Sequence, residues 1–205
     1  MRHTGTQTIA TERLTLRRFT IEDAENMYYN WASDPEVTRY LTWQPHKSVE
    51  ETAEILQQWE AGYSKNEFYQ WAIELNDIEQ PIGSISVVSL NEDVQSAELG
   101  YCIGKSWWHQ GYTTEAVEAV IRFLMAEVGA GRVWAQHDVA NPNSGEVMKK
   151  AGMDYEGTLR QSTRNNQGIV DAAVYAKISH VAFEEEPEAE EQTGGASAVS
   201  YTHLR

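Results

Sequence analysis

Apolar and polar residues alternate along several short segments of the chain, which is the pattern of strands that bury one face. Residues 68–75, FYQWAIEL, place Tyr69, Trp71 and Ile73 on one side and polar or small residues between them. Six other segments show a comparable pattern, at residues 12–19, 84–90, 96–104, 132–139, 153–160 and 171–178. The sequence therefore predicts about seven strands.

Helix-start signals separate these strands. Thr20 with Asp23, and Ser48 with Glu51, match the capping box, in which a hydroxyl residue precedes an acidic residue by three positions. Gly62 stands just beyond the last turn of the second segment, where a glycine commonly ends a helix. The expected helices cover residues 20–32, 49–61, 113–129 and 143–152.

The order of these elements predicts the fold class. One strand and two helices come first, then three strands, a helix, a strand, a helix and two strands. Three consecutive strands favour antiparallel pairing, whereas the strand–helix–strand passage over residues 97–139 favours one parallel crossover. We expect an α+β protein whose mixed, mostly antiparallel sheet of six to seven strands has helices on both faces.

The composition changes near the C-terminal end. Residues 184–205 are rich in Glu, Gly, Ser and Ala and show no apolar periodicity, which is typical of disorder. Residues 199–205 also resemble translated sequencing-adapter sequence, so the natural end is expected earlier. We expect one domain over residues 10–180, followed by an acidic tail over residues 184–205.

The formal charge of the 205-residue chain is −15, and most of it lies outside the tail. An acidic domain argues against a nucleic-acid partner, because phosphate binding requires clustered Lys and Arg. It suits a cationic acceptor such as an amine or a basic peptide, although solubility alone is an alternative explanation. The N-terminus has no long apolar run, so we expect neither a signal peptide nor a membrane partner, and a cytoplasmic location.

Metal and covalent chemistry have little support in the sequence. Cys102 is the single cysteine, so neither an internal disulfide nor a cysteine-based zinc site is possible. His109 and His137 do not have metal-ligand spacing, and no histidine is implied beside Cys102 to activate it. We expect no metal site.

One short segment suggests an anion site. Residues 106–120, SWWHQGYTTEAVEAV, place Gly111, Thr113 and Thr114 directly before or within the first turn of a helix. A helix N-terminus has about four backbone N–H groups without partners and a partial positive charge, and therefore binds phosphate groups well. An ordinary strand–helix turn has the same composition, so this signal is weak alone.

The surrounding residues resemble a known family. Residues 97–124, AELGYCIGKSWWHQGYTTEAVEAVIRFL, are similar to the core motif of the GNAT superfamily, the Gcn5-related N-acetyltransferases. They resemble most the branch of the bacterial ribosomal-protein N-terminal (alanine) acetyltransferases, and the resemblance extends over residues 11–178. The matching residues are Glu98, Gly100, Tyr101, Trp108, Gln110, Gly111, Tyr112, Thr114, Glu115 and Ala116. Trp108 and Thr113 depart from the residues that many members have.

The resemblance implies acetyl-CoA as co-substrate. It implies a β-bulge in the strand over residues 96–104, which separates that strand from the next and leaves a gap for the pantetheine arm near Cys102 and Ile103. It also implies that Asn141 contacts the pantetheine amides. The residues implied to bind the diphosphate through backbone N–H groups are Gln110, Gly111, Tyr112, Thr113 and Thr114.

The resemblance also implies an acyl transfer from a thioester to an amine, which requires a proton acceptor. Glu98 is the candidate base, because its neighbours Leu99, Tyr101 and Ile103 predict a partly apolar setting that raises its pKa. The alternative is that Glu98 only attracts a cation. A backbone N–H near Ile103 is the candidate for stabilising the negative charge on the carbonyl oxygen.

The leaving thiolate requires a hydrogen-bond donor. Many members have a tyrosine seven residues after the asparagine matched by Asn141, but this chain has Met148 there. Ser144 takes the matching place in the ribosomal-protein branch and is the candidate donor, besides a role in the first helical turn. Thr163 stands where some members of that branch have a glutamate, which weakens the case for a ribosomal-protein substrate.

The resemblance also implies that the segment between the two early helices shapes the acceptor site. Residues 39–48, RYLTWQPHKS, lie there, and Tyr40 and Trp43 are the candidate acceptor-binding residues. The expected function is transfer of an acetyl group to a primary amine, with the α-amino group of a protein such as a ribosomal protein as the leading acceptor. The alternatives are a small-molecule acetyltransferase for polyamines, amino acids or aminoglycosides, and a non-catalytic acyl-CoA-binding module. The expected assembly is a monomer or a homodimer.

Overall fold

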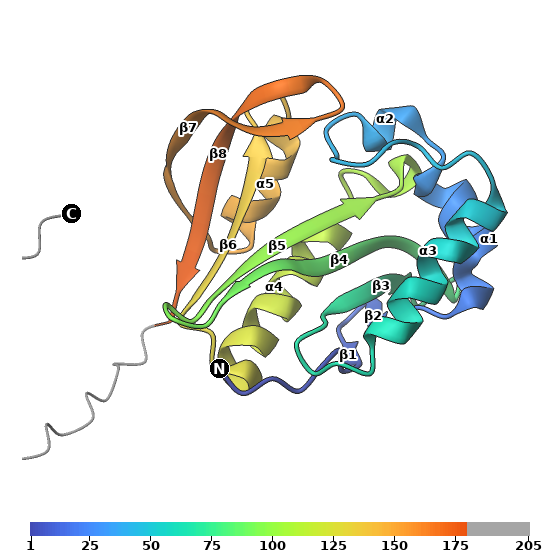
Figure 1. Cartoon of the computed structure of the whole chain (residues 1–205), viewed down its shortest axis with the longest axis horizontal. Coiled ribbons are helices and arrows are strands. Elements are labelled where there is room, and N and C mark those ends of the chain that lie inside the picture. Colours follow the sequence, from blue (N-terminus) through green and yellow to red (C-terminus); the bar gives the residue numbers. More distant parts are fainter. Residues whose placement is uncertain (180–205) are drawn as a thin grey trace, which may run out of the picture.

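The computed structural model describes residues 1–179 and contains an eight-stranded sheet in the order β1-β2-β3-β4-β5-β6-β8-β7 (Figure 1). The strands are β1 (Ile9–Ala10), β2 (Leu14–Arg17), β3 (Gln70–Leu75), β4 (Gln80–Asn91), β5 (Ser96–Ile103), β6 (Arg132–Asp138), β7 (Asp154–Asn165) and β8 (Gly168–Ile178). The helical segments are η1 (Ile21–Asp23), α1 (Ala24–Met27), η2 (Tyr28–Ala32), α2 (Pro35–Thr38), α3 (Val49–Gly62), η3 (Lys105–Trp107), α4 (Tyr112–Phe123), η4 (Leu124–Val128) and α5 (Pro142–Lys150). The expected tail over residues 184–205 lies outside the described residues, and the proposed domain limits stay a prediction.

The sheet is mixed and mostly antiparallel, as the sequence predicts. All neighbouring strands pair antiparallel except β5 and β6, which are parallel and joined by α4. The prediction of six to seven strands is wrong because it misses β1, which has only two residues. Two residues are too few for an alternating pattern, so β1 could not be recognised from the sequence.

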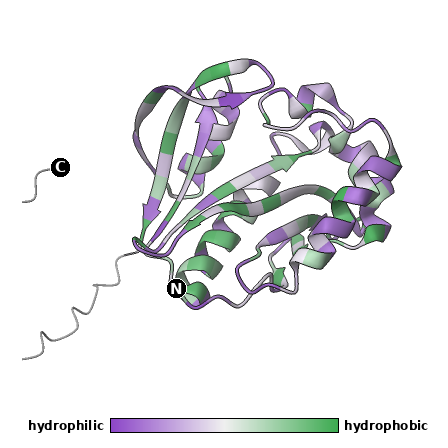
Figure 2. Cartoon of the chain, viewed as in Figure 1, coloured by the Kyte–Doolittle hydropathy of each residue, from purple (hydrophilic) through white to green (hydrophobic). Residues whose placement is uncertain are grey.

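Helices cover both faces of the sheet, which confirms that part of the prediction. Trp71 and Ile73 of β3 belong to the apolar cluster that includes α4, whereas Ala72 belongs to the cluster that includes α1 and α3. Alternate residues of a strand point to opposite faces, so these two clusters lie on opposite sides of the sheet. Figure 2 shows the apolar residues concentrated in α4 and in the central strands. Among residues 1–179, no helix is both long and apolar enough to cross a membrane.

All four predicted helices differ from the structure at their boundaries. The helix expected over residues 113–129 is α4 followed by the π-helical η4, and the one expected over residues 143–152 is α5, which begins and ends earlier. The segment over residues 20–32 is divided into η1, α1 and the π-helical η2, rather than forming one continuous helix. The second helix, α3, ends at Gly62 itself and not before it. The two expected N-terminal capping residues are correct: the Ser48 side chain accepts from the Glu51 N–H, and the Thr20 N–H donates to Asp23.

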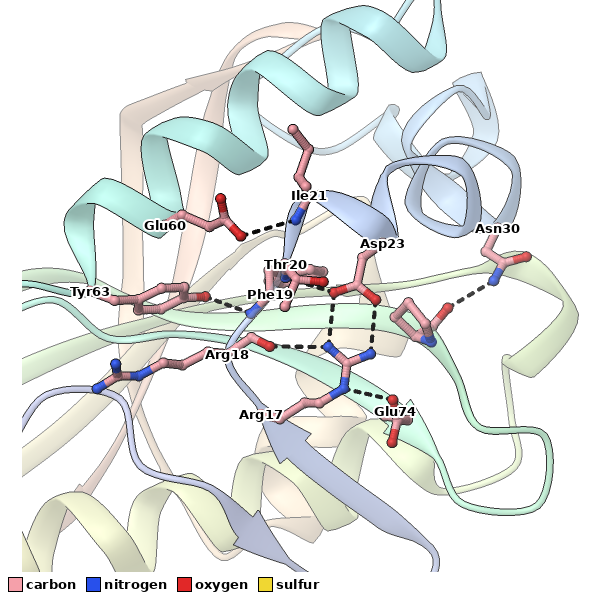
Figure 3. Close-up of polar contacts among 11 residues, drawn as sticks. Arg17, Arg18, Phe19, Thr20, Ile21, Asp23, Asn30, Glu60, Tyr63 and Glu74 are labelled. Atoms are coloured by element: carbon pink, nitrogen blue, oxygen red, sulfur yellow. Dashed lines mark hydrogen bonds and ion pairs between the residues drawn. The ribbon is translucent and has the colours of Figure 1, made fainter.

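A network of charged side chains connects β2 to the first helical segment (Figure 3). Arg17 donates two hydrogen bonds of 2.8 Å to the carboxylate of Asp23 and one of 2.6 Å to Glu74 on β3. The hydrogen bonds to Asp23 and Glu74 raise the pKa of Arg17 above its ordinary value, although burial acts to lower it. The Tyr63 hydroxyl of the α3 C-cap accepts from the Phe19 N–H. The network fixes the start of the helical segment that contains Met27, one of the residues lining the cavity described below.

We expect the substitution Arg17→Met to lower the free energy of unfolding by about 2–3 kcal/mol, because it leaves two largely buried carboxylates without their cation. Urea denaturation measures the effect. The triple variant in which Asp23→Asn and Glu74→Gln accompany Arg17→Met should recover part of the loss. A single variant as stable as the unsubstituted chain would show that the network contributes nothing to stability.

The parallel strands β5 and β6 diverge (Figure 1). Their pairing ends at Leu99 and Ala135, after which β5 continues beside β4 and β6 continues beside β8. The expected gap between the two strands is therefore present. The bulge, however, is in β4: Val87 pairs with Leu99 and Ser89 with Glu98, so that Val88 is the additional residue. The prediction of a bulge in residues 96–104 is wrong, because the sequence of one strand does not show which partner has the extra residue.

Candidate active site

A single cavity of about 1030 Å³ connects the first turn of α4, the gap between β5 and β6, and the loop after α2. Ten of the twelve residues predicted for the site line this cavity: Tyr40, Trp43, Glu98, Cys102, Ile103, Gly111, Thr113, Thr114, Asn141 and Ser144. They come from the loop after α2, from β5, from the start of α4 and from α5. The exceptions are Gln110 and Tyr112.

The entrance to α4 has the backbone geometry of an anion site. Gly111 is the N-cap and adopts a left-handed conformation with φ of 83°, which favours glycine. Within the described residues, the N–H groups from Gln110 to Thr114 have no hydrogen-bond partner, and the first bond of the helix is from Glu115 N–H to the Gly111 carbonyl. Donors without partners at a helix N-terminus, beside a cavity, can bind phosphate oxygens.

The side chains of Gln110 and Tyr112 have structural roles. The Gln110 amide donates to the Ser106 carbonyl, and the Tyr112 ring lies under the Arg13 guanidinium, 4.4 Å from its Cζ. Neither side chain lines the cavity, so their predicted part in coenzyme binding is restricted to their backbone.

Arg13 and Glu115 position the turn before α4, and the sequence analysis missed this role. Arg13 donates 2.7 Å bonds to Glu115 and a 3.0 Å bond to the carbonyl of Gln110. Burial acts to raise the pKa of Glu115, but the hydrogen bonds from Thr11 and Arg13 outweigh it and lower the pKa overall. Arg13 and Glu115 lie 102 positions apart in the sequence, so their pairing could not be recognised from the sequence alone.

In β5, the backbone N–H of Ile103, rather than that of Cys102, points toward the gap between β5 and β6. The Gly104 N–H donates to the Ile82 carbonyl, so the pair Ile103–Gly83 is of the non-hydrogen-bonded type and its N–H faces away from β4. The Ile103 carbonyl accepts a 2.9 Å bond from the Trp108 indole. The backbone of Cys102 faces Ser84 of β4 instead, which corrects the expectation that it pairs with a ligand in the gap.

Glu98 of β5 lines the cavity. Its carboxylate accepts a 2.9 Å hydrogen bond from Gln136 of β6. Burial raises the pKa of Glu98, and the bond from Gln136 partly opposes this. The direction is as predicted but the reason differs, because Leu99 and Ile103 belong to the cluster on the α4 side and point to the opposite face of the strand.

Ser144 of α5 has a partner that the sequence analysis did not assign. The hydroxyl of Tyr101 donates a 3.0 Å bond to the Ser144 carbonyl, and its oxygen lies 3.1 Å from the Ser144 Oγ. Burial raises the pKa of Tyr101. Met148, which takes the place of a donor in other sequences, is buried in the core.

Asn141 is the N-cap residue of α5, but its side chain makes no capping bond and lines the cavity. His109 and His137 line it too. Among residues 1–179, no group of three or more His, Cys, Asp or Glu side chains could bind a metal ion. Burial raises the pKa of the Cys102 thiol, and its side chain lies 3.4 Å from the Ser84 hydroxyl, consistent with a packed thiol.

The loop after α2 is joined to the tip of the β7–β8 hairpin mainly through Asn166, with a longer bond of 3.5 Å from the Gln167 amide to the Arg39 carbonyl. The Asn166 side chain donates 2.8 Å bonds to the carbonyls of Thr38 and Trp43, and its backbone N–H donates to the Leu41 carbonyl. We call these contacts the Asn166 bridge. It positions the loop that contains Tyr40 and Trp43, and it brings Thr163 of β7 to the same cavity.

Comparisons with known proteins agree with this arrangement. The profile of the family Acetyltransferase (GNAT) domain matches residues 13–154. The uncharacterised N-acetyltransferase YoaA of Bacillus subtilis is 32% identical over 170 residues, covering 83% of this chain and 96% of that protein.

Two further proteins have named acceptors. The ribosomal-protein-serine acetyltransferase of Escherichia coli is 31% identical over 97 residues, covering 47% of this chain and 54% of its own. A solved structure of RimL, a ribosomal L7/L12 α-N-protein acetyltransferase in complex with coenzyme A, has a TM-score of 0.75 and 20% identity, and covers 84% of this chain and 98% of its own. The matches of profile, sequence and fold show that this chain belongs to the GNAT family of acetyltransferases.

Proposed function

We propose that this chain transfers the acetyl group of acetyl-CoA to the α-amino group of a protein or peptide, with a ribosomal protein as the leading candidate. One observation carries the proposal: a single cavity joins partner-free amides at the start of α4 to the carboxylate of Glu98. The cavity passes through the gap between β5 and β6, where an extended ligand can reach both ends. The solved structure of RimL with coenzyme A supports the same co-substrate.

The residues that line the cavity fit the chemistry of this coenzyme. The N–H groups of Gly111, Thr113 and Thr114 would bind the diphosphate, since they lack partners among the described residues. The Ile103 N–H would bond to the acyl end and Asn141 to a pantetheine amide. The coenzyme supplies an activated thioester.

The acceptor amine must lose a proton during the transfer. Its nitrogen forms a bond to the acetyl carbonyl carbon, the carbon–sulfur bond breaks, and one amine proton passes to Glu98. The Ile103 N–H stabilises the negative charge on the carbonyl oxygen. The sulfur leaves as a thiolate that accepts a hydrogen bond from the Ser144 hydroxyl. The Tyr101 hydroxyl is protonated at neutral pH, as an ordinary tyrosine is, and its bond to the Ser144 carbonyl can hold Ser144 in place.

A protein acceptor is favoured by the relatives whose names state one, the Escherichia coli enzyme and RimL. Acetyl transfer to peptides of defined N-terminal residue, beside a panel of polyamines, amino acids and aminoglycosides, tests the proposal by mass spectrometry. We expect one acetyl group on the peptide α-amine. Acetylation confined to the small amines would contradict a peptide acceptor and support the small-molecule alternative, and coenzyme binding without any transfer would support the non-catalytic one.

Two adjacent lysines of α5 provide a matched test of the coenzyme path. Lys150 lines both the main cavity and a second cavity of about 460 Å³ beside the start of α4, whereas Lys149 lines neither and is paired with Glu146 at 2.8 Å. We expect Lys150→Ala to raise the Kd of coenzyme A about three- to tenfold, because an exposed cation near a phosphate contributes about 1 kcal/mol. Isothermal titration calorimetry should find Lys149→Ala unchanged. Equal changes in Kd for the two substitutions would show that the coenzyme phosphates do not bind near Lys150.

A further inference from the structure

Two arginines line the acceptor end of the cavity. Arg39 follows α2, and its guanidinium Cζ lies 5.2 Å from the centre of the Tyr40 ring. Arg164 lies on β7 next to Thr163, close to the tip of the β7–β8 hairpin. Both arginines are exposed to solvent, so both guanidinium groups are accessible to a ligand that enters this end.

The segments that contain these arginines are fixed against each other. The Asn166 bridge connects the hairpin tip to the loop after α2 through the carbonyls of Thr38, Leu41 and Trp43. Arg39 and Arg164 each stand one or two positions from a bridged residue. Because the bridge restricts both segments, the two cations stay on the wall of one cavity without needing a ligand to bring them together.

Neither arginine has a carboxylate partner among residues 1–179, although the chain has 31 acidic residues against 16 basic ones. The nearby carboxylates have other partners. Glu36 is paired with Lys105, and Asp138 accepts from the Asn165 amide and the Ala140 N–H. The net charge of the chain favours a basic acceptor, but Arg39 and Arg164 provide two cations without an ion-pair partner, within the described residues, at this end of the cavity.

We propose that the acceptor is an acidic peptide N-terminus, whose carboxylate side chain binds Arg39 and Arg164 while its α-amine faces Glu98. This inference rests on the proposed function and narrows its substrate class. Arginine binds carboxylates through paired N–H donors, which gives a directional contact as well as charge attraction. The two arginines thus select the acceptor by a side chain close to its amino end, and Glu98 acts on the amine.

The test uses peptides that differ only by Glu or Gln at one of positions two to four. The unsubstituted chain should acetylate the best Glu peptide with a kcat/KM about two- to fivefold above that of its Gln counterpart, the range for an exposed charge pair. Arg39→Gln and Arg164→Gln should each reduce this ratio toward one. Arg160→Gln is the matched control, since Arg160 is an exposed arginine of β7 that does not line the cavity.

A charge reversal provides a gain of function. The Arg164→Glu variant should acetylate a Lys peptide better than the Glu peptide, a result that misfolding cannot produce. Peptide binding to the coenzyme-loaded chain is measured as well, so that failure of acetyl transfer, which contradicts the proposed function, is distinguished from failure of charge recognition. Equal affinity and equal kcat/KM for Glu and Gln peptides at every position would overturn the inference, as would an Arg160→Gln effect equal to that of Arg164→Gln.

Discussion

The substitution Glu98→Gln is expected to lower kcat at neutral pH by about 100-fold, within the range that a positioned general base contributes. The substitution keeps the shape of the side chain, so the fold and coenzyme affinity should change little. It removes the proposed acceptor of the amine proton, and the Gln136 amide remains as a hydrogen-bond donor beside it. Steady-state kinetics with the best peptide acceptor measures the effect.

The pH profile separates a base from a carboxylate that only attracts the amine. Burial raises the pKa of Glu98 above its ordinary value of 4.5, so kcat should fall as the pH decreases through this raised pKa and the carboxylate becomes protonated. The Gln variant should lack this acidic limb. The control is Glu146→Gln, because Glu146 also lines the cavity but is paired with Lys149. An unchanged kcat and an unchanged limb in Glu98→Gln would exclude Glu98 as the base.

The substitution Gly111→Ala is expected to raise the Kd of acetyl-CoA at least tenfold. Gly111 has a φ of 83°, which costs a residue with a Cβ about 1–3 kcal/mol. The new Cβ would also lie 3.3 Å from a guanidinium nitrogen of Arg13, the side chain that holds this turn. Relief of either conflict moves the amides that follow. A loss of 1.4 kcal/mol in binding is already tenfold.

Gly129→Ala is the control for backbone strain. Gly129 has a similar φ of 79° at the other end of the same helical segment, and a Cβ added there meets no atom within 4 Å. Both substitutions should lower thermal stability, but only Gly111→Ala should weaken coenzyme binding in calorimetry. If both variants bind acetyl-CoA as well as the unsubstituted chain, the start of α4 is not the diphosphate site.

Local signals in the sequence predict much of the fold, because they depend on residues a few positions apart. The strand β3, the capping pairs Thr20–Asp23 and Ser48–Glu51, and the parallel crossover through α4 are all confirmed, although β3 is buried on both faces rather than on one. The bulge at Val88 is not predictable in this way, since it depends on how β4 and β5 align.

The candidate site is predictable to a smaller extent. The resemblance to a family identified ten residues that do line the cavity, but their roles stay predictions. The partners that position them are distant in sequence: Gln136 for Glu98 and Tyr101 for Ser144. These contacts arise from strand register and helix packing, which composition and spacing do not encode.

A crystal structure of this chain with acetyl-CoA tests the central claim most directly. We expect the diphosphate oxygens within hydrogen-bond distance of the N–H groups between Gly111 and Thr114, the pantetheine arm between β5 and β6, and the thioester between Glu98 and Ser144. A diphosphate bound away from the start of α4, with the gap between the two strands empty, would contradict the account.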